Sequence, residues 1–245
     1  MRTLLFFLSL FALPNLSAAC TVRLAVASNF RATLERLVTA YEDEANTEFQ
    51  IISGASGTLF SQILRGAPFD FFFSADAEKV ERLENRGRTF GASWTYAIGR
   101  MSLWTPGRNA TAVLESNDPI ETISIANPKH APYGAAAASW IEAHWGSDKS
   151  VRTVVGANVA QAFHFVKTGN ADAGLVALSQ LISEGIPVNE YVTLPDDQYP
   201  SIRQKAALLR SPACAASSGF ARFLRSTEAA AVIELSGYVT GQESE

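Results

Sequence analysis

The residues best suited to bind a ligand lie where four short β-branched segments pass directly into helix-like patterns. The segments are VRLAVAS, ending at Ser28; FQIISGAS, ending at Ser56; TISIANPKHAPY, ending at Tyr133; and RTVVGAN, ending at Asn158. The first turn of a helix leaves backbone N–H groups unpaired and presents the positive end of the helix dipole, and both features favour anions. Ser28 and Ser56, as expected helix caps, add hydroxyl donors. Four converging helix starts would form an anion site without a formal positive charge.

A tetrahedral oxyanion that is fully deprotonated at neutral pH only accepts hydrogen bonds, so its site needs donors and no carboxylate. The junctions supply such donors from Ser28, Asn29, Ser56, Gly57, Tyr133 and the backbone N–H of Val159. Hydrogen bonds to charged groups contribute about 1.5–3 kcal/mol each. Roughly six to eight of them therefore support micromolar to nanomolar affinity after the costs of association. Taken alone, each junction is better explained as an ordinary helix cap, and only the four together favour a binding site.

The N-terminus has the three-part pattern of a secretory signal peptide. Arg2 precedes an apolar stretch from Leu4 to Leu13, and the small residues Ser17-Ala18-Ala19 follow. This stretch is too short to span a membrane as a helix. We expect residues 1–19 to be removed and the mature chain to be soluble and exported. Cys20 follows directly, which leaves a lipid anchor open, although Leu16 lies one place too far away for the usual lipoprotein motif.

The charge argues against nucleic acid and anionic membranes as partners. The chain has 20 Lys and Arg against 24 Asp and Glu, a net charge of −4, and no basic run. Such a chain has no electrostatic footprint for polyanions. Any anion it binds must be held by local dipoles.

The chain has two cysteines, Cys20 and Cys214. In an oxidising compartment they are expected to form a disulfide that ties the N-terminal strand to the C-terminal segment. Two free thiols, or a lipidated Cys20, are the alternatives.

Strand-like and helix-like patterns alternate throughout, which predicts an α/β protein with mostly parallel sheets flanked by helices. Helical spacing covers residues 30–45 and 57–65, and FDFFFSA is expected to be a fully buried strand before Asp76, the cap of the next helix. The extended segment 96–104, with Gly99 inside it, predicts a crossing between two lobes, and SIRQKAALLR predicts the return. We therefore divide the chain into residues 20–98 plus 207–245 for one lobe and 99–206 for the other.

Six segments together resemble one known family. They are AVASNF (25–30), GASGTLFSQI (54–63), GAPFDFFFSAD (66–76), YAIGRMSLW (96–104), IANPKHAPYGAAA (125–137) and GLVALSQ (174–180). These segments resemble the periplasmic molybdate-binding protein of an ABC transporter, over essentially the whole mature chain. The resemblance implies a type 2, two-lobe periplasmic-binding-protein fold that closes on molybdate or tungstate in the interlobe cleft and delivers it to a membrane permease. It also implies a periplasmic monomer with no enzymatic cofactor.

Matching the motifs places the family's oxyanion contacts on Ser28, Asn29, Ser56, Tyr133 and Val159. The resemblance implies that molybdenum is held as its oxyanion, without a direct bond from the protein to the metal, and it implies no catalytic residue. This chain departs from some members in having Ala177 where they have a tyrosine. We expect Tyr133 and Asn29 to replace the missing hydroxyl.

Other classes of function fit the residues less well. Ser56 in G-A-S-G-T lacks the last glycine of a G-x-S-x-G nucleophile elbow, which weakens the alternative of an exported serine hydrolase. The histidines His130, His144 and His164 lack zinc-site spacing, and ferric iron would require a cluster of tyrosine, histidine and carboxylate ligands. Phosphate would need an acceptor, for which Asp76 is the candidate. Sulfate remains the alternative oxyanion, and a purely structural role would leave the converging helix starts unexplained.

Overall fold

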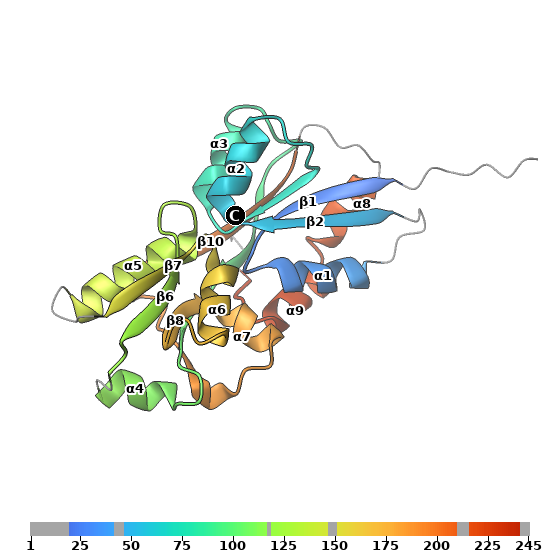
Figure 1. Ribbon diagram of the computed structural model, residues 1–245. Helices are drawn as coiled ribbons and strands as arrows, with labels where there is room; N and C mark the ends of the chain where they lie inside the picture. Colours follow the sequence, from blue (N-terminus) through green and yellow to red (C-terminus); the bar gives the residue numbers. More distant parts are fainter. Residues whose placement is uncertain (1–19, 42–46, 117–118, 147–150, 210–215, 241–245) are drawn as a thin grey trace, which may run out of the picture.

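The computed structural model describes residues 20–41, 47–116, 119–146, 151–209 and 216–240. These residues form two five-stranded sheets, with strand orders β2-β1-β3-β10-β4 and β7-β6-β8-β5-β9. Figure 1 shows the sheets as the centres of two lobes with helices packed around each. The predicted α/β class with helices flanking the sheets is confirmed.

The two sheets share one plan. In the first, β1 (Thr21–Ala27), β2 (Glu48–Gly54) and β3 (Phe71–Ser74) are parallel, while β10 (Ile202–Leu208) runs antiparallel between β3 and β4 (Trp94–Gly99). In the second, β6 (Thr122–Ala126), β7 (Arg152–Gly156) and β8 (Ala173–Ala177) are parallel, while β5 (Met101–Trp104) runs antiparallel between β8 and β9 (Tyr191–Thr193). In open α/β sheets, ligands bind beyond the carboxyl ends of the parallel strands.

Helices connect these strands or, as α8 and α9 do, follow the last of them. Those of the first lobe are α1 (Arg31–Ala40), α2 (Ser56–Leu64), α3 (Ala77–Glu84), α8 (Ala216–Phe223) and α9 (Thr227–Leu235). Those of the second are α4 (Ala110–Ser116), α5 (Pro132–Trp145), α6 (Val159–Lys167) and α7 (Leu178–Ser183), followed by the short 3₁₀ helix η1 (Val188–Glu190). No helix in the described ranges is long and apolar enough to cross a membrane.

The core of the first lobe lies on both faces of its sheet. Every residue of β3 is buried, as the sequence predicts for FDFFFSA. Because side chains alternate along a strand, Phe71 and Phe73 pack with Leu34 in one hydrophobic cluster, and Phe72 packs with Leu59 in another. Apolar packing on both faces thus surrounds β3 where it pairs with β1.

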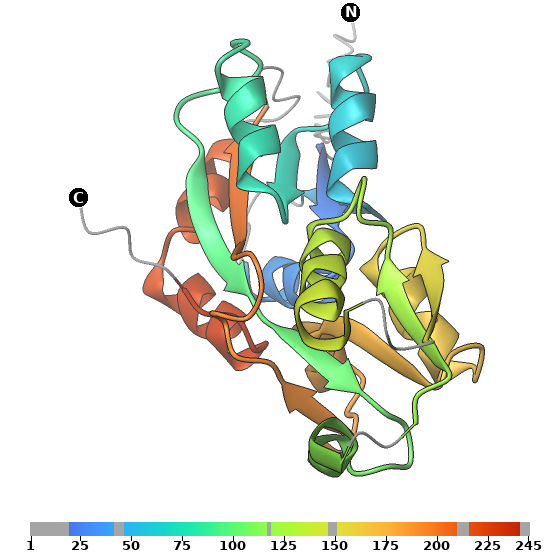
Figure 2. The same cartoon turned by 90° about the vertical axis from the view of Figure 1, so that its left-hand side faces the viewer.

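The chain crosses from the first sheet to the second at Arg100, between β4 and β5, and Figure 2 shows these two strands following one another from lobe to lobe. The predicted crossing within residues 96–104 is thus observed. The returning strand β10 begins at Ile202, so the expected boundary at residue 207 falls inside a strand of the first sheet. Residues 1–19 and Cys214 lie outside the described residues, so the signal peptide and the disulfide remain predictions.

Candidate anion-binding site

The strand ends of the two lobes meet in the middle of the molecule. Ala27 and Ala55, at the ends of β1 and β2, belong to one hydrophobic cluster with Tyr133 and Val159 from the starts of α5 and α6. Backbone hydrogen bonds join the lobes there: the N–H of Ala160 donates to Ser28 Oγ over 3.4 Å, and that of Gly57 donates to the carbonyl oxygen of His130 over 2.9 Å. All four predicted junctions are therefore brought together.

Ser28 and Ser56 are held in the same way. Ser28 is 9% exposed and Ser56 1% exposed, and each Oγ accepts a backbone hydrogen bond, from Ala160 over 3.4 Å and from Ala75 over 3.0 Å. Because a serine hydroxyl has one proton and two lone pairs, each hydroxyl keeps its own proton to donate. Both side chains are thus prepared as donors to an anion.

Neither serine caps its helix, which corrects the expectation from sequence. The N-cap positions are Phe30 for α1 and Ala55 for α2, and neither makes a side-chain capping bond. Ser28 lies in a turn closed by the bond from Phe30 N to Ala27 O, over 2.9 Å. Ser56 is already helical, and its hydroxyl bonds to the chain just after β3.

The second lobe contributes two helix starts. Tyr133 is the second residue of α5 and Val159 the first residue of α6, so their backbone N–H groups belong to first turns, which lack partners within the helix. Asn158 caps α6 as predicted, with its side chain accepting from Gln161 N over 3.0 Å. The fold therefore directs backbone donors from this lobe toward the serines.

Two donors that the sequence suggested are used elsewhere. Asn29 Nδ2 donates to Gln204 Oε1 over 2.9 Å and to Tyr238 Oη over 3.1 Å, which occupies both of its hydrogens. The backbone N–H of Gly57 bonds to His130. At position 29, the donor that remains available to an anion is the backbone N–H group.

The side chain of Tyr133 points to the crossing between the lobes. Its hydroxyl is buried, has no hydrogen-bond partner, and lies beside Gly99 and Gln204. Burial, with smaller contributions from neighbouring tyrosines, outweighs the opposite effect of Gln204 and holds the pKa of Tyr133 well above its usual value, so the phenol keeps its proton. Sequence reasoning missed Gln204, whose only local signal is a polar residue between Ile202 and Ala206 on the buried face of a strand.

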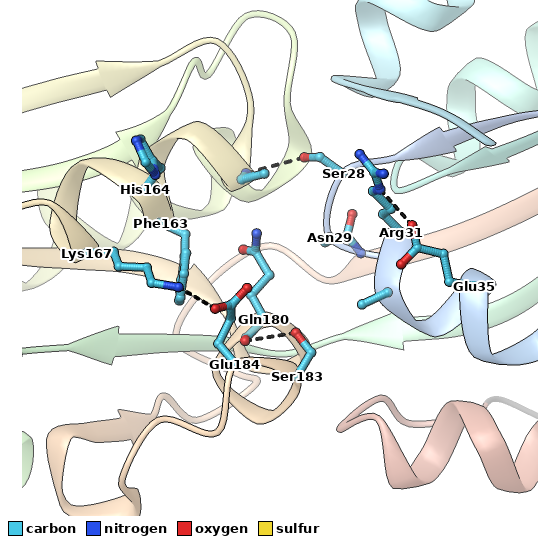
Figure 3. A pocket seen from close by; sticks show the side chains of 12 residues that line it. Ser28, Asn29, Arg31, Glu35, Phe163, His164, Lys167, Gln180, Ser183 and Glu184 are labelled. Carbon is cyan, nitrogen blue, oxygen red and sulfur yellow. Dashed lines mark hydrogen bonds and ion pairs between the residues drawn. The ribbon is translucent and has the colours of Figure 1, made fainter.

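A cavity of about 330 Å³ opens beside Ser28 and Asn29, between α1 on one lobe and α6 and α7 on the other (Figure 3). Its charged lining is paired: Arg31 with Glu35 over 2.9 Å, and Lys167 with Glu184 over 2.5 Å. Each Lys or Arg among the described lining residues thus has an acidic partner. The lining provides no isolated positive charge to hold the anion.

Two observations concern metal-ligating and acidic side chains. No group of three or more His, Cys, Asp or Glu side chains that could hold a metal occurs in the described part of the chain. Asp76 takes the predicted N-cap position of α3, but its side chain pairs with Lys79 instead of capping the helix. Its carboxylate is therefore already engaged.

The model of the bacterial extracellular solute-binding protein family matches residues 22–239. The chain belongs to this family. The solute-binding protein is 38% identical over 229 residues to the molybdate-binding protein ModA of Azotobacter vinelandii, covering 90% of each chain. It is 37% identical over 237 residues to the molybdate-binding protein ModA of Rhodobacter capsulatus, covering 94% of this chain and 91% of the relative.

The solved structure of the Azotobacter vinelandii periplasmic molybdate-binding protein matches this solute-binding protein with a TM-score of 0.83 and 33% identity, covering 90% of this chain and 100% of that one. The two-lobe periplasmic-binding-protein fold and the resemblance stated from the motifs are thus confirmed. A sulfate-binding protein from Mycobacterium tuberculosis, at 12% identity and a TM-score of 0.64, shares the fold. Since the close relatives are binding proteins, the family is one of ligand carriers and not of enzymes.

Proposed function

We propose that this solute-binding protein captures molybdate, and also tungstate, and delivers it to the membrane permease of an ABC transporter. The observation that supports this most directly is the hydrogen bonding of the two serine hydroxyls. Ser28 Oγ and Ser56 Oγ each accept from a backbone N–H, so each hydroxyl proton is left to donate into the space where the helix starts meet. The anion is cargo in this proposal, and no cofactor is needed.

The donor set suits a fully deprotonated oxyanion. Hydroxyls of Ser28 and Ser56 act with backbone N–H groups of Asn29, Tyr133 and Val159, while the charged residues nearby are paired with each other. We expect such a site to offer donors to the oxygens of the anion and no carboxylate to accept a proton from it. Phosphate, which keeps a proton near neutral pH, is disfavoured by this arrangement.

We expect selection against sulfate to depend on the size of the site. Molybdate and tungstate have longer bonds to oxygen than sulfate, so the smaller anion cannot reach all donors of a cage fitted to the larger ones. Each buried donor left unpaired costs about 1–3 kcal/mol. Two unpaired donors would weaken sulfate binding by roughly 30-fold or more.

The wider organisation is proposed on the same basis. The family is extracellular, which agrees with a periplasmic location reached after removal of residues 1–19. We propose a first lobe that ends with β4 at Gly99 and resumes with β10 at Ile202, in place of the boundary at residue 207. We also propose a disulfide between Cys20 and Cys214, and a monomer that presents both lobes to the permease. Closure around the anion brings Ser28 against Ala160 and Gly57 against His130.

Isothermal titration calorimetry of the purified protein, dialysed free of bound anion, tests this function. Molybdate and tungstate are expected to bind one to one with micromolar or tighter affinity, while sulfate and phosphate give no heat under the same conditions. Binding of sulfate alone would overturn the choice of ligand. Silence with all four anions would overturn the oxyanion-carrier proposal itself.

A further inference from the structure

A cluster of buried polar side chains lies beside the crossing between the lobes. We name it the crossing cluster; its members are all 6% exposed or less and are Asn29, Tyr96, Tyr133, Ser179, Gln204 and Tyr238. Tyr133 and Ser179 come from the second lobe, and the others come from the first. None of the anion contacts named above requires Gln204, Tyr96, Ser179 or Tyr238.

Gln204 is at the centre of this cluster and is fully buried. Its Oε1 accepts from Asn29 Nδ2 and from Tyr96 Oη, each over 2.9 Å. Because only the carboxamide oxygen can accept, these two donors fix the orientation of the group. Its Nε2 must therefore point away from Asn29.

The fixed Nε2 faces the hydroxyl of Tyr133. A Cβ atom placed on Gly99 would lie 2.3 Å from Tyr133 Oη and 2.7 Å from Gln204 Nε2, so the two atoms flank the same small residue. Both atoms are buried and neither makes a hydrogen bond of ordinary length and angle. They lie near enough for Gln204 to lower the pKa of Tyr133. Buried polar groups are rarely left unpaired, since the penalty is large. One is a donor and the other has an accepting lone pair, so a small shift of α5 would pair them.

We propose that Gln204 is a positioning residue for the anion site. It holds Asn29 of the first lobe through Oε1 and, once the anion is bound, the hydroxyl of Tyr133 of the second lobe through Nε2. This inference rests on the proposed function, because it assigns to Gln204 the alignment of the donors that bind the oxyanion. Gln204 itself does not touch the anion.

The contacts of Asn29 and Tyr133 explain how Gln204 can align the donors. Asn29 directly follows Ser28, and its carbonyl oxygen is held by Ser179 Oγ over 3.0 Å and by Tyr238 Oη over 2.8 Å. Tyr133 is the second residue of α5, so its side chain and its backbone N–H move together. A bond from Gln204 to Tyr133 therefore ties one donor-bearing segment of each lobe to the same carboxamide.

A double-mutant cycle tests the proposal. Molybdate affinity is measured by calorimetry for the wild type, Gln204→Met, Tyr133→Phe and the double variant, and each variant's thermal unfolding is recorded without anion. We expect Gln204→Met to weaken binding about 10- to 50-fold and Tyr133→Phe about 3- to 10-fold. The double variant should bind no more weakly than Gln204→Met alone, because both substitutions remove the same bond.

Matched controls separate this coupling from a general loss of structure. Gln198→Met removes a glutamine whose Oε1 accepts from Trp140 Nε1 over 3.1 Å in the second lobe, and it should bind as the wild type does. Tyr199→Phe removes a hydroxyl that bonds to Met101 N and Asp196, and it should also retain affinity. If Gln204→Met does not fold, the difference between Tyr133→Phe and Tyr199→Phe still tests the role of the Tyr133 hydroxyl.

The outcomes distinguish the inference from the function on which it rests. The positioning role is overturned if the wild type binds tightly and the two substitutions have multiplicative effects on affinity. It is also overturned if the affinity of Gln204→Met is unchanged. In both cases the carrier function stands. Equal affinities in Tyr133→Phe and Tyr199→Phe overturn it as well. A wild type that does not bind molybdate overturns the carrier function.

Discussion

The hydroxyl oxygen of Ser28 accepts a hydrogen bond from the backbone N–H of Ala160 across the gap between the lobes, over 3.4 Å. The bond joins the end of β1 to the first turn of α6. It occupies one lone pair of the hydroxyl and so limits the directions that the remaining proton can take, and it forms only when the lobes are close. Closure of the lobes therefore also orients the Ser28 hydroxyl as a hydrogen-bond donor.

Replacing either serine by alanine should remove one donor to a charged acceptor. We expect Ser28→Ala and Ser56→Ala to weaken molybdate binding by roughly 10- to 100-fold each, which corresponds to about 1.5–3 kcal/mol. Calorimetry measures this effect. Ser236→Ala serves as the control, because Ser236 is also buried but bonds to Val232 O at the end of α9. Equal affinities in the serine variants and this control would rule out the serines as ligands.

The backbone donor at Val159 can be deleted without shortening the helix. Val159 is the first residue of α6, a position that tolerates proline, and Asn158 before it is extended, with φ −152° and ψ 176°. Val159→Pro removes the N–H group and keeps a side chain of similar size. Binding should fall by roughly 10- to 100-fold, with little change in the unfolding temperature. Unchanged binding would exclude this N–H as a contact.

The alternation of strands and helices, the buried β3 and a crossing within residues 96–104 could all be predicted, because each depends on patterns local in sequence. The partners of the site residues could not. Ser56 was expected to cap a helix, yet its hydroxyl bonds to Ala75, nineteen residues away. The residue type indicates that a serine hydroxyl will form a hydrogen bond. Its partner depends on which strand ends lie next to each other in the folded sheet.

Asn29 shows the same limit over a longer range. Its side chain bonds to Gln204 and Tyr238, which are 175 and 209 residues away along the chain. Nothing around position 29 indicates that both amide hydrogens are occupied. Only the return of β10 into the first sheet, between β3 and β4, brings Gln204 beside Asn29.

The stability of the second lobe should depend on pH through Asp172. Its carboxylate accepts from Thr122 Oγ1 over 2.7 Å and from Thr122 N over 2.8 Å, where β6 and β8 begin side by side. The Thr122 hydroxyl, with further help from backbone N–H groups, lowers the pKa of Asp172 below its usual value. The folded state therefore binds this proton more weakly than the unfolded state. Its stabilising effect is complete above the unfolded pKa, about 3.9, and is lost as the pH falls through the lower folded pKa.

Asp172→Asn is accordingly expected to lower the unfolding temperature at pH 7, and the difference from the wild type should shrink as the pH falls from 4 to 2. Thermal unfolding followed by circular dichroism at each pH measures this. Glu35→Gln, which affects a surface ion pair with Arg31, is the control. A difference between wild type and Asp172→Asn that stays constant down to pH 2 would contradict the assignment.

Closure itself can be tested at Gly57. Its backbone N–H bonds to His130 O over 2.9 Å, and an added Cβ would lie 3.1 Å from that oxygen and 3.2 Å from His130 Cα. Gly57→Ala should therefore hold the lobes slightly apart, at a cost of about 1 kcal/mol, and weaken molybdate binding roughly fivefold. Gly54→Ala is the matched control, because its Cβ would meet only the Leu59 side chain, at 3.5 Å or more. Since the crowding at Gly57 exists only between closed lobes, the dissociation rate in stopped-flow fluorescence should rise while the unfolding temperature without anion stays the same. A lower unfolding temperature with an unchanged dissociation rate would show that Gly57 acts on folding and not on closure.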